Sequence, residues 1–89
     1  MRIKLELFGV SRDFSDKDHL EFNIKEKIEI KELRKEIINY LEKNFKGNKS
    51  FKKIVESSAF CSEDNNIIND DFKIIKDQKI GIIPPIGGG

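Results

Sequence analysis

The residues that could do chemistry in this chain are the last six, Pro84-Pro85-Ile86-Gly87-Gly88-Gly89. Proline has φ fixed at about −65° and donates no backbone hydrogen bond, so a strand that reaches Pro84 and Pro85 must end there. The three glycines have no side chains, which leaves them free in conformation and narrow enough to enter a slot. We therefore expect a tail whose reacting group is the terminal carboxylate of Gly89, with Gly88 next to it.

An alternative interpretation is that the terminal glycines are a frayed or added end without function. The residues before them favour a functional tail. The run Ile80-Gly81-Ile82-Ile83 is typical of a buried strand, and it leads directly into the two prolines. A rigid exit from a core strand followed by a flexible tip is an unusual arrangement for an accidental terminus. We therefore expect one domain over residues 1–83 and a flexible tail over residues 84–89.

Composition and charge argue against several classes of function. The chain has 89 residues, with 17 basic and 16 acidic side chains and a net charge of +1, a balance that argues against a nucleic-acid-binding protein. The basic residues between Lys43 and Lys53 are interpreted as a solvated loop, with a docking patch as the alternative. The single cysteine, Cys61, fits a reducing cytosol and is expected to be a small buried side chain. His19 has no second histidine or nearby cysteine, so we predict no metal site.

No apolar run approaches the roughly 18 residues that indicate a membrane-spanning helix. The sequence also opens directly on a strand pattern, without a charged and then apolar signal segment. We therefore expect a cytoplasmic protein that contacts no membrane.

Two stretches near the start of the chain alternate between apolar and polar residues, which is the pattern of half-buried strands. The first covers residues 2–8 and the second residues 20–24, and together they predict an antiparallel hairpin. Their inward-facing residues are expected to be Ile3, Leu5, Leu7, Leu20, Phe22 and Ile24. Phe14, in the polar connection between them, is expected to anchor that connection to the core. Phe8 places an aromatic ring on the polar face, either as a contact residue or in a second small apolar cluster.

Helical spacing replaces this alternation from about Ile30. The residues that share one face of the predicted helix are Ile30, Leu33, Ile37, Tyr40 and Leu41. No Ser, Thr or Asp marks the start of the helix, and Gly47 fits the position just past its end. Residues 48–56 are interpreted as a lysine-rich connection in which Ile54 and Val55 either begin a strand or pack the loop down.

Three more strands are predicted after the helix, over residues 57–62, 67–68 and 79–83, while Phe72 and Ile74 are expected to pack inward. The last of these strands is a nearly continuous apolar run, which favours a central position beside the first strand and parallel to it. The predicted fold class is therefore α+β, with the β-grasp layout of a mixed four- to five-stranded sheet packed on one main helix.

Four stretches carry a resemblance to a known family: Leu7-Phe8-Gly9, Arg12-Asp13, Ile30-Lys31-Glu32-Leu33-Arg34, and residues 80–89. In these stretches, and over the whole chain, the sequence resembles the MoaD-like sulfur carriers, the small subunits of molybdopterin synthase, which have a ubiquitin-like β-grasp fold. The family pattern ends in an apolar strand, Pro-Pro, an apolar residue, a small residue and Gly-Gly. The chain departs from it at Gly87, where the family usually has Ser or Thr, and at residues 77–79, where it usually has Gly-Asp-Glu.

This resemblance implies a function for the tail. A carboxylate is a poor electrophile, so an adenylating partner would use ATP to convert the Gly89 carboxylate to an acyl-adenylate, and sulfur would then replace AMP to give a thiocarboxylate. Two such carriers would supply the dithiolene sulfurs of molybdopterin, which is built on cyclic pyranopterin monophosphate. The chain would then be a sulfur-donating subunit that is not an enzyme alone and that holds no cofactor of its own.

The resemblance also implies partners. These are a MoaE-like large subunit of molybdopterin synthase, with which a heterotetramer is expected, and a MoeB-like, E1-like adenylating enzyme; no nucleic-acid partner is implied. Phe8, Ile67 and Ile83 are the expected apolar docking surface. Pro84 and Pro85 would aim the tail, and the partner-binding segment would continue through Ile86 and Gly87 to the reactive end.

Three alternatives stay open. The chain could be a sulfur carrier for thiamin synthesis or tRNA thiolation, although thiamin carriers are usually shorter and lack the Pro-Pro pair. It could be a ubiquitin-like modifier in which Gly89 forms an isopeptide bond with a lysine. It could also be a β-grasp interaction module with an inert tail. The sequence does not identify the activating enzyme or the sulfur donor, and it does not distinguish a molybdenum from a tungsten pathway.

Overall fold

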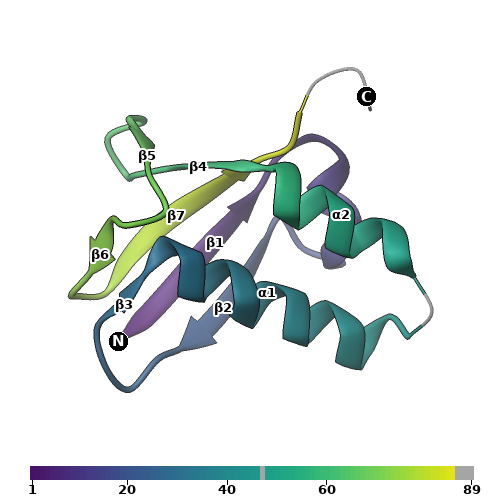
Figure 1. The fold of residues 1–89 in the computed structure, drawn as a ribbon, viewed down its shortest axis with the longest axis horizontal. Coiled ribbons are helices and arrows are strands. Elements are labelled where there is room, and N and C mark those ends of the chain that lie inside the picture. Colours follow the sequence, from purple (N-terminus) through teal and green to yellow (C-terminus); the bar gives the residue numbers. More distant parts are fainter. Residues whose placement is uncertain (47, 86–89) are drawn as a thin grey trace.

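A five-stranded sheet forms the centre of the molecule, and two helices lie across one of its faces (Figure 1). The computed structural model describes residues 1–46 and 48–85. The strands of this sheet are β1 (Arg2–Leu7), β2 (His19–Asn23), β4 (Ala59–Cys61), β5 (Ile67–Ile68) and β7 (Gln78–Ile83). Their order is β2-β1-β7-β4-β5, with β1 and β7 parallel and the other neighbours antiparallel. The predicted mixed sheet and the central last strand are therefore confirmed.

The apolar residues of β1 and β7 meet in the middle of the sheet. The register places Leu5 opposite Ile80 and Leu7 opposite Ile82. These side chains point to the helix side and are buried, with Leu5, Ile80 and Ile82 at 0% exposure. The predicted hairpin of β1 and β2 is also confirmed, and it sets Leu5 opposite Leu20. Successive side chains of these strands alternate between the two faces of the sheet, and the helices bury one face. This determines which residues face the core and which face outward.

The main helix, α1 (Ile30–Asn44), begins where its periodicity predicts. Its buried residues are Ile30, Leu33, Ile37 and Leu41. Two glutamates cap the start of this helix. The backbone N–H of Glu29 donates to Glu32 Oε1 at 3.2 Å. The helix ends at Asn44, and Gly47, the predicted residue past the end, lies outside the described residues.

A second helix, α2 (Lys49–Ser57), occupies the stretch that the sequence analysis interpreted as a connection or the start of a strand, so that interpretation was wrong. Phe51, Ile54 and Val55 have the i, i+3, i+4 spacing of a helix face, and all three pack against the core. Lysines fill the rest of the helix and hid this short pattern. The following strand consequently begins at Ala59, later than the predicted residue 57.

Other short elements were also not predicted. The connection between β1 and β2 contains a 3-10 helix, η1 (Gly9–Phe14), and Phe14 at its end is fully buried, as expected. A separate antiparallel pair is formed by β3 (Ile28–Glu29) and β6 (Lys73–Ile74). Neither β3 nor β6 shows an alternation in the sequence, so only the inward packing of Phe72 and Ile74 was predicted there, and both do pack on the core.

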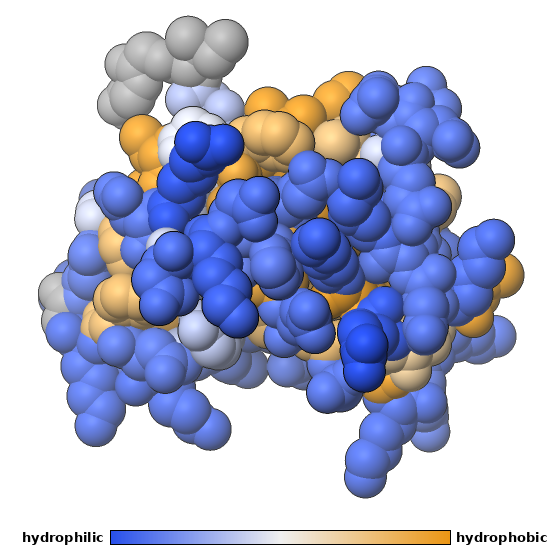
Figure 2. Space-filling view, turned by 180° about the vertical axis from the view of Figure 1, so that it is seen from behind, coloured by the Kyte–Doolittle hydropathy of each residue, from blue (hydrophilic) through white to orange (hydrophobic). Residues whose placement is uncertain are grey.

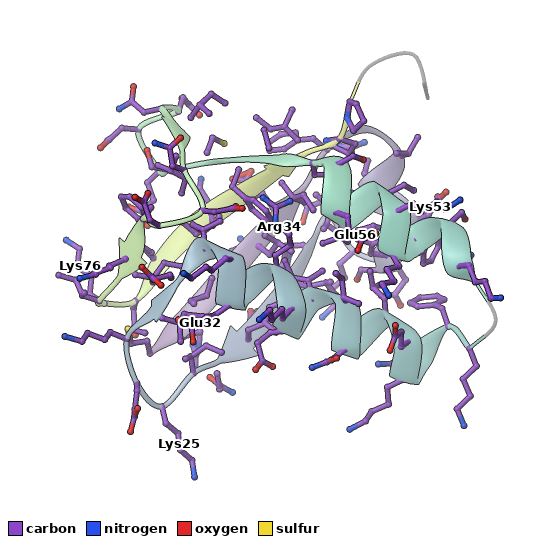
Figure 3. The ribbon with its side chains drawn as sticks, viewed as in Figure 1. Lys25, Glu32, Arg34, Lys53, Glu56 and Lys76 are labelled. Atoms are coloured by element: carbon purple, nitrogen blue, oxygen red, sulfur yellow. The ribbon has the colours of Figure 1, made fainter. Side chains whose placement is uncertain are left out.

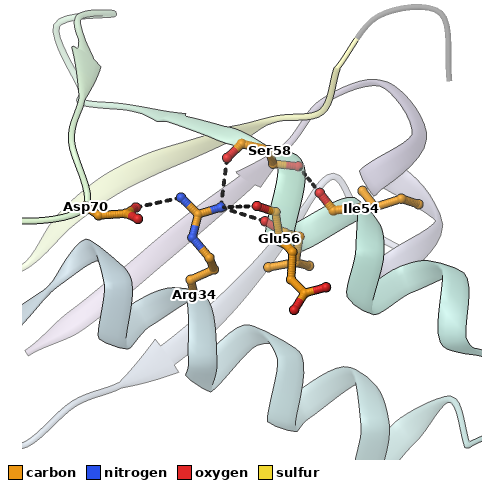
Figure 4. Close-up of polar contacts among 6 residues, drawn as sticks. Arg34, Ile54, Glu56, Ser58 and Asp70 are labelled. Atoms are coloured by element: carbon orange, nitrogen blue, oxygen red, sulfur yellow. Dashed lines mark hydrogen bonds and ion pairs between the residues drawn. The ribbon is translucent and has the colours of Figure 1, made fainter. Parts of the chain in front are cut away.

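Arg34 on α1 fastens α2 and β4 to the main helix (Figure 4). One guanidinium nitrogen, Nη1, donates to the carbonyl oxygens of Val55 at 2.7 Å and Ser58 at 2.8 Å. The other terminal nitrogen, Nη2, donates to Asp70 Oδ1 at 2.6 Å. The guanidinium carbon also lies 4.8 Å from the centre of the Phe60 ring. Arg34 therefore caps the end of α2, whose last carbonyls have no partner within the helix.

We predict that Arg34→Ala lowers the free energy of unfolding by about 3 kcal/mol, because it removes the donor to the Ser58 carbonyl and to Asp70 and one of the two donors to the Val55 carbonyl. Arg34→Lys should lose most of this stability, since an ammonium cannot reproduce the planar fork. Denaturant unfolding measures both effects. Lys35→Ala, at the exposed neighbouring position, is the control and should change stability by no more than about 0.5 kcal/mol. An Arg34→Lys protein as stable as the original would contradict this role.

Candidate functional site

The parallel strands β1 and β7 end at the same edge of the sheet, so the residues that follow them lie close together. Phe8 follows β1, and Pro84 follows β7 after Ile83. Pro84 is buried, whereas Pro85 is exposed. Gly9 has a φ of +57°, and a Cβ built on it would be 4.0 Å from the Pro84 ring. The left-handed turn at Gly9 thus starts η1 beside the proline exit.

Gly81 in β7 lies directly beneath the Phe8 ring, on the sheet face opposite the helices. A Cβ built on Gly81 would be 2.7 Å from Cys61 Sγ and 3.0 Å from Phe8 Cε2. Real Cβ atoms do not approach other atoms so closely, so only glycine lets the ring and the thiol pack onto the strand at this point. The Phe8 ring and the Cys61 thiol thus both pack against Gly81, and the exposed fraction of Cys61 is 8%.

An apolar patch extends from this contact across three strands. Residues directly opposite one another in paired strands share a face of the sheet. Cys61 is opposite both Gly81 and Ile67, and Ala59 is opposite Ile83. We name this surface the outer patch; it consists of Phe8, Ala59, Cys61, Ile67, Gly81 and Ile83. The side chains of Phe8 and Ile67 are 42% and 64% exposed.

Figure 2 views the molecule from the side opposite to Figure 1 and shows hydrophobic atoms gathered along its upper edge, while hydrophilic atoms cover most of the rest of this face. Charged residues border the outer patch on β1 and β7. Lys79 Nζ lies 3.0 Å from Glu6 Oε1. The hydrogen bond to Glu6 raises the pKa of Lys79. The ion pair therefore stabilises the fold at pH values below this pKa, and this stabilisation is lost as the pH rises through the pKa.

His19 lies on the same face as Glu6, in β2, and is paired with acidic residues. Its Nδ1 is 2.9 Å from Asp18 Oδ1, and its Nε2 is 3.6 Å from Glu21 Oε1. The hydrogen bond with His19 lowers the pKa of Asp18. In residues 1–46 and 48–85 there is no group of three or more His, Cys, Asp or Glu side chains that could hold a metal ion. The same residues include no helix long and apolar enough to cross a bilayer.

The structure brings the three residues of the expected docking surface, Phe8, Ile67 and Ile83, to one face of the sheet. It places Pro84 and Pro85 at the exit from β7. Four further expected site residues, Ile86, Gly87, Gly88 and Gly89, lie outside the described residues. The sequence analysis did not identify Gly81 as a residue of this surface. Its position inside an apolar strand was the available signal, because a glycine there often marks a point where another group packs closely against the backbone.

We predict that Gly81→Val displaces the Phe8 ring and the Cys61 thiol, because a side chain at this position would overlap both. In NMR spectra, contacts between the Phe8 ring and residue 81 should be replaced by a solvent-exposed Phe8 signal. The stability loss should be modest, about 1 kcal/mol, since both displaced groups can rotate away. Ala59→Val, at an exposed position on the same face, is the control and should leave Phe8 in place. A Phe8 ring unmoved by Gly81→Val would contradict the packing described here.

No protein-family model and no curated protein sequence matches the chain. Solved structures match it in fold. One is a Pyrococcus furiosus protein assigned as molybdopterin converting factor, subunit 1, with a TM-score of 0.70, 18% identity and coverage of 96% of this chain and 98% of that chain. Another is SAMP1 from Haloferax volcanii, with a TM-score of 0.69, 10% identity and full coverage of both chains, 100% each.

Identities this low establish a shared fold and nothing finer. Both structures align with nearly the whole chain, so the likeness covers the sheet, the main helix and the connections between them. The chain has the ubiquitin-like β-grasp fold that its sequence predicted.

Proposed function

We propose that this chain is a MoaD-like sulfur carrier whose terminal glycine, Gly89, is adenylated and then converted to a thiocarboxylate. The observation that carries the proposal is that the Pro84-Pro85 exit directly follows Ile83 of the outer patch, at the sheet edge where Phe8 also lies. A partner that docks on the patch would meet the start of the Gly-rich segment. The likeness in fold to molybdopterin converting factor, subunit 1, supports the same function.

The proposed chemistry starts at a carboxylate, which does not react with a sulfur nucleophile unaided. An activating enzyme would join the Gly89 carboxylate to the α-phosphorus of ATP, which forms an acyl-adenylate and releases pyrophosphate. A hydrosulfide equivalent from a sulfur donor would then attack the carbonyl carbon and displace AMP, leaving a thiocarboxylate. ATP is thus a substrate of the activating partner, and the carrier itself supplies the reacting group and the surface by which it is held.

Molybdopterin synthesis is the proposed destination of the sulfur. The large subunit of molybdopterin synthase would bind the outer patch and accept the tail, and two carriers in a heterotetramer would provide the two dithiolene sulfurs. Absence of a side chain at Gly88 and Gly89 suits a tail that must enter both the activating enzyme and the synthase. In this reaction the carrier acts as a sulfur-donating subunit and not as the catalyst.

A second candidate function is conjugation to other proteins. SAMP1, a ubiquitin-like small archaeal modifier, shares the fold, and this likeness fits the alternative. Mass spectrometry of the protein isolated from its own cells separates the two functions. A terminal mass change equal to the replacement of one oxygen by sulfur supports the carrier, whereas branched peptides that join Gly89 to lysines support the modifier.

We predict that deletion of Gly89 abolishes thiocarboxylate formation and leaves the fold intact, because the reacting carboxylate is then displaced by one residue. The assay incubates the protein with a MoeB-like enzyme, ATP and a sulfur donor and follows pyrophosphate release and the terminal mass. Gly87→Ser is the matched control and should stay active, since Ser is usual at this position in the family it resembles. Undiminished thiocarboxylate formation in the shortened chain would refute the proposed chemistry.

We also predict that Ile67→Asp weakens binding to the large synthase subunit by about tenfold or more, because it places a charge in the apolar contact. Calorimetric titration measures the affinity. The chain offers a closely matched control, because Ile75 is exposed to a similar degree, 67% against 64%, but lies outside the outer patch. Ile75→Asp should bind normally. Equal affinities for the two variants would show that the patch is not the docking surface.

A further inference from the structure

A second distinctive surface lies where α1 ends and α2 begins, in the helix layer and therefore on the opposite side of the sheet from the outer patch (Figure 1). Residues 43–53 contain five lysines and no acidic residue. The whole chain has a net charge of +1, so the residues outside this segment have a net charge of −4. We name this surface the lysine corner; it consists of Lys43, Lys46, Lys49, Lys52 and Lys53.

The lysines of this corner are exposed and carry uncompensated charge. All five side chains are exposed, and none of them takes part in an ion pair within the described part of the chain. Lys46, Lys49 and Lys52 line one open hollow of about 250 Å³, together with Phe45, Asn48 and a single acidic residue, Glu42. Figure 3 shows Lys53 extending outward from α2. Several positive charges therefore converge on one recess, from α2 and from the connection that precedes it.

Aromatic packing connects the residues beside the lysine corner to the core. The Phe45 and Phe51 rings have their centres 5.2 Å apart, and the Phe51 and Phe14 rings 4.9 Å apart. Phe14 is fully buried in the core, so this chain of rings fixes the start of α2 to the rest of the molecule.

The composition of the corner favours carboxylates over nucleic acid as the ligand. It contains no arginine, the residue that best matches phosphate groups and bases. The Phe45 and Phe51 rings are only partly exposed and pack on each other, so they are not free to stack on bases. The net charge of −4 over the rest of the chain would repel an extended polyanion beyond the corner. A short acidic protein segment fits these conditions.

We propose that the lysine corner is a binding surface for an acidic segment of a partner protein, separate from the outer patch. Because the two surfaces lie on opposite sides of the sheet, occupation of one leaves the other accessible. The corner would attract the acidic segment from a distance, and binding would weaken as salt screens the charges.

The test uses the complete chain and a short peptide of glutamates, with the corresponding glutamine peptide and a single-stranded RNA of similar length as comparison ligands. NMR titration at low and high ionic strength should show amide shifts from the glutamate peptide that are concentrated in residues 43–53. The glutamine peptide should cause none. The triple variant Lys46→Gln, Lys49→Gln, Lys52→Gln should bind the glutamate peptide about tenfold more weakly or worse.

The matched control removes the same number of lysines elsewhere. Lys25, Lys27 and Lys76 are exposed and lie away from the corner; Figure 3 shows Lys25 and Lys76 toward the end of the molecule opposite Lys53. The triple variant of these residues to Gln has the same net charge as the test variant. It should keep an affinity within about twofold of the original, since charges beyond the screening length contribute little.

Three results would overturn the proposal. The first is equal weakening by the two triple variants, which would mean that the peptide responds only to net charge. The second is tighter binding of the RNA than of the glutamate peptide, which would assign the corner to nucleic acid. The third is the absence of amide shifts in residues 43–53 at low ionic strength. None of these readouts involves Gly89 or the outer patch, so they are independent of the sulfur-carrier function.

Discussion

The parallel pairing of β1 with β7 is the constraint on which the rest of the molecule depends. Its register joins Leu5 to Ile80 and Leu7 to Ile82 in the core and leaves Gly81 facing outward. A slip of one residue would turn every buried side chain of one strand to the other face, so burial fixes the register strongly. The same pairing brings both strand ends to one edge. The contact of Phe8 with Gly81 and the position of the proline exit thus both result from this one pairing of strands.

Much of this architecture could be predicted from the sequence because it rests on periodicity. Alternation in β1 and β2, helical spacing in α1 and the continuous apolar run of β7 each extend over enough residues to be recognised. The second helix could not be recognised in the same way. Its apolar face has only Phe51, Ile54 and Val55, surrounded by lysines, and its end depends on Arg34, which comes from a distant part of the chain. Such tertiary capping leaves no local pattern.

The candidate site was predictable in its parts but not in its geometry. Phe8, Ile67 and Ile83 could be proposed from exposure, from position at strand ends and from the family resemblance. Their common face depends on the register of β4 with β5 and β7, which no local pattern specifies. The contact of Phe8 with Gly81 depends on a different register, that of β1 with β7. Three residues of the outer patch could therefore be proposed before the structure, whereas Gly81 and the arrangement of the patch depend on strand pairing.

The burial of Cys61 has a consequence for a chain that would carry an activated carbonyl at its end. A free thiolate nearby is a competing nucleophile that could capture an acyl-adenylate as an internal thioester and discharge it before delivery. The chain has a single cysteine, whose sulfur packs against Gly81 with 8% of the residue exposed. Burial of the Cys61 sulfur against Gly81 would thus limit its attack on the proposed activated end.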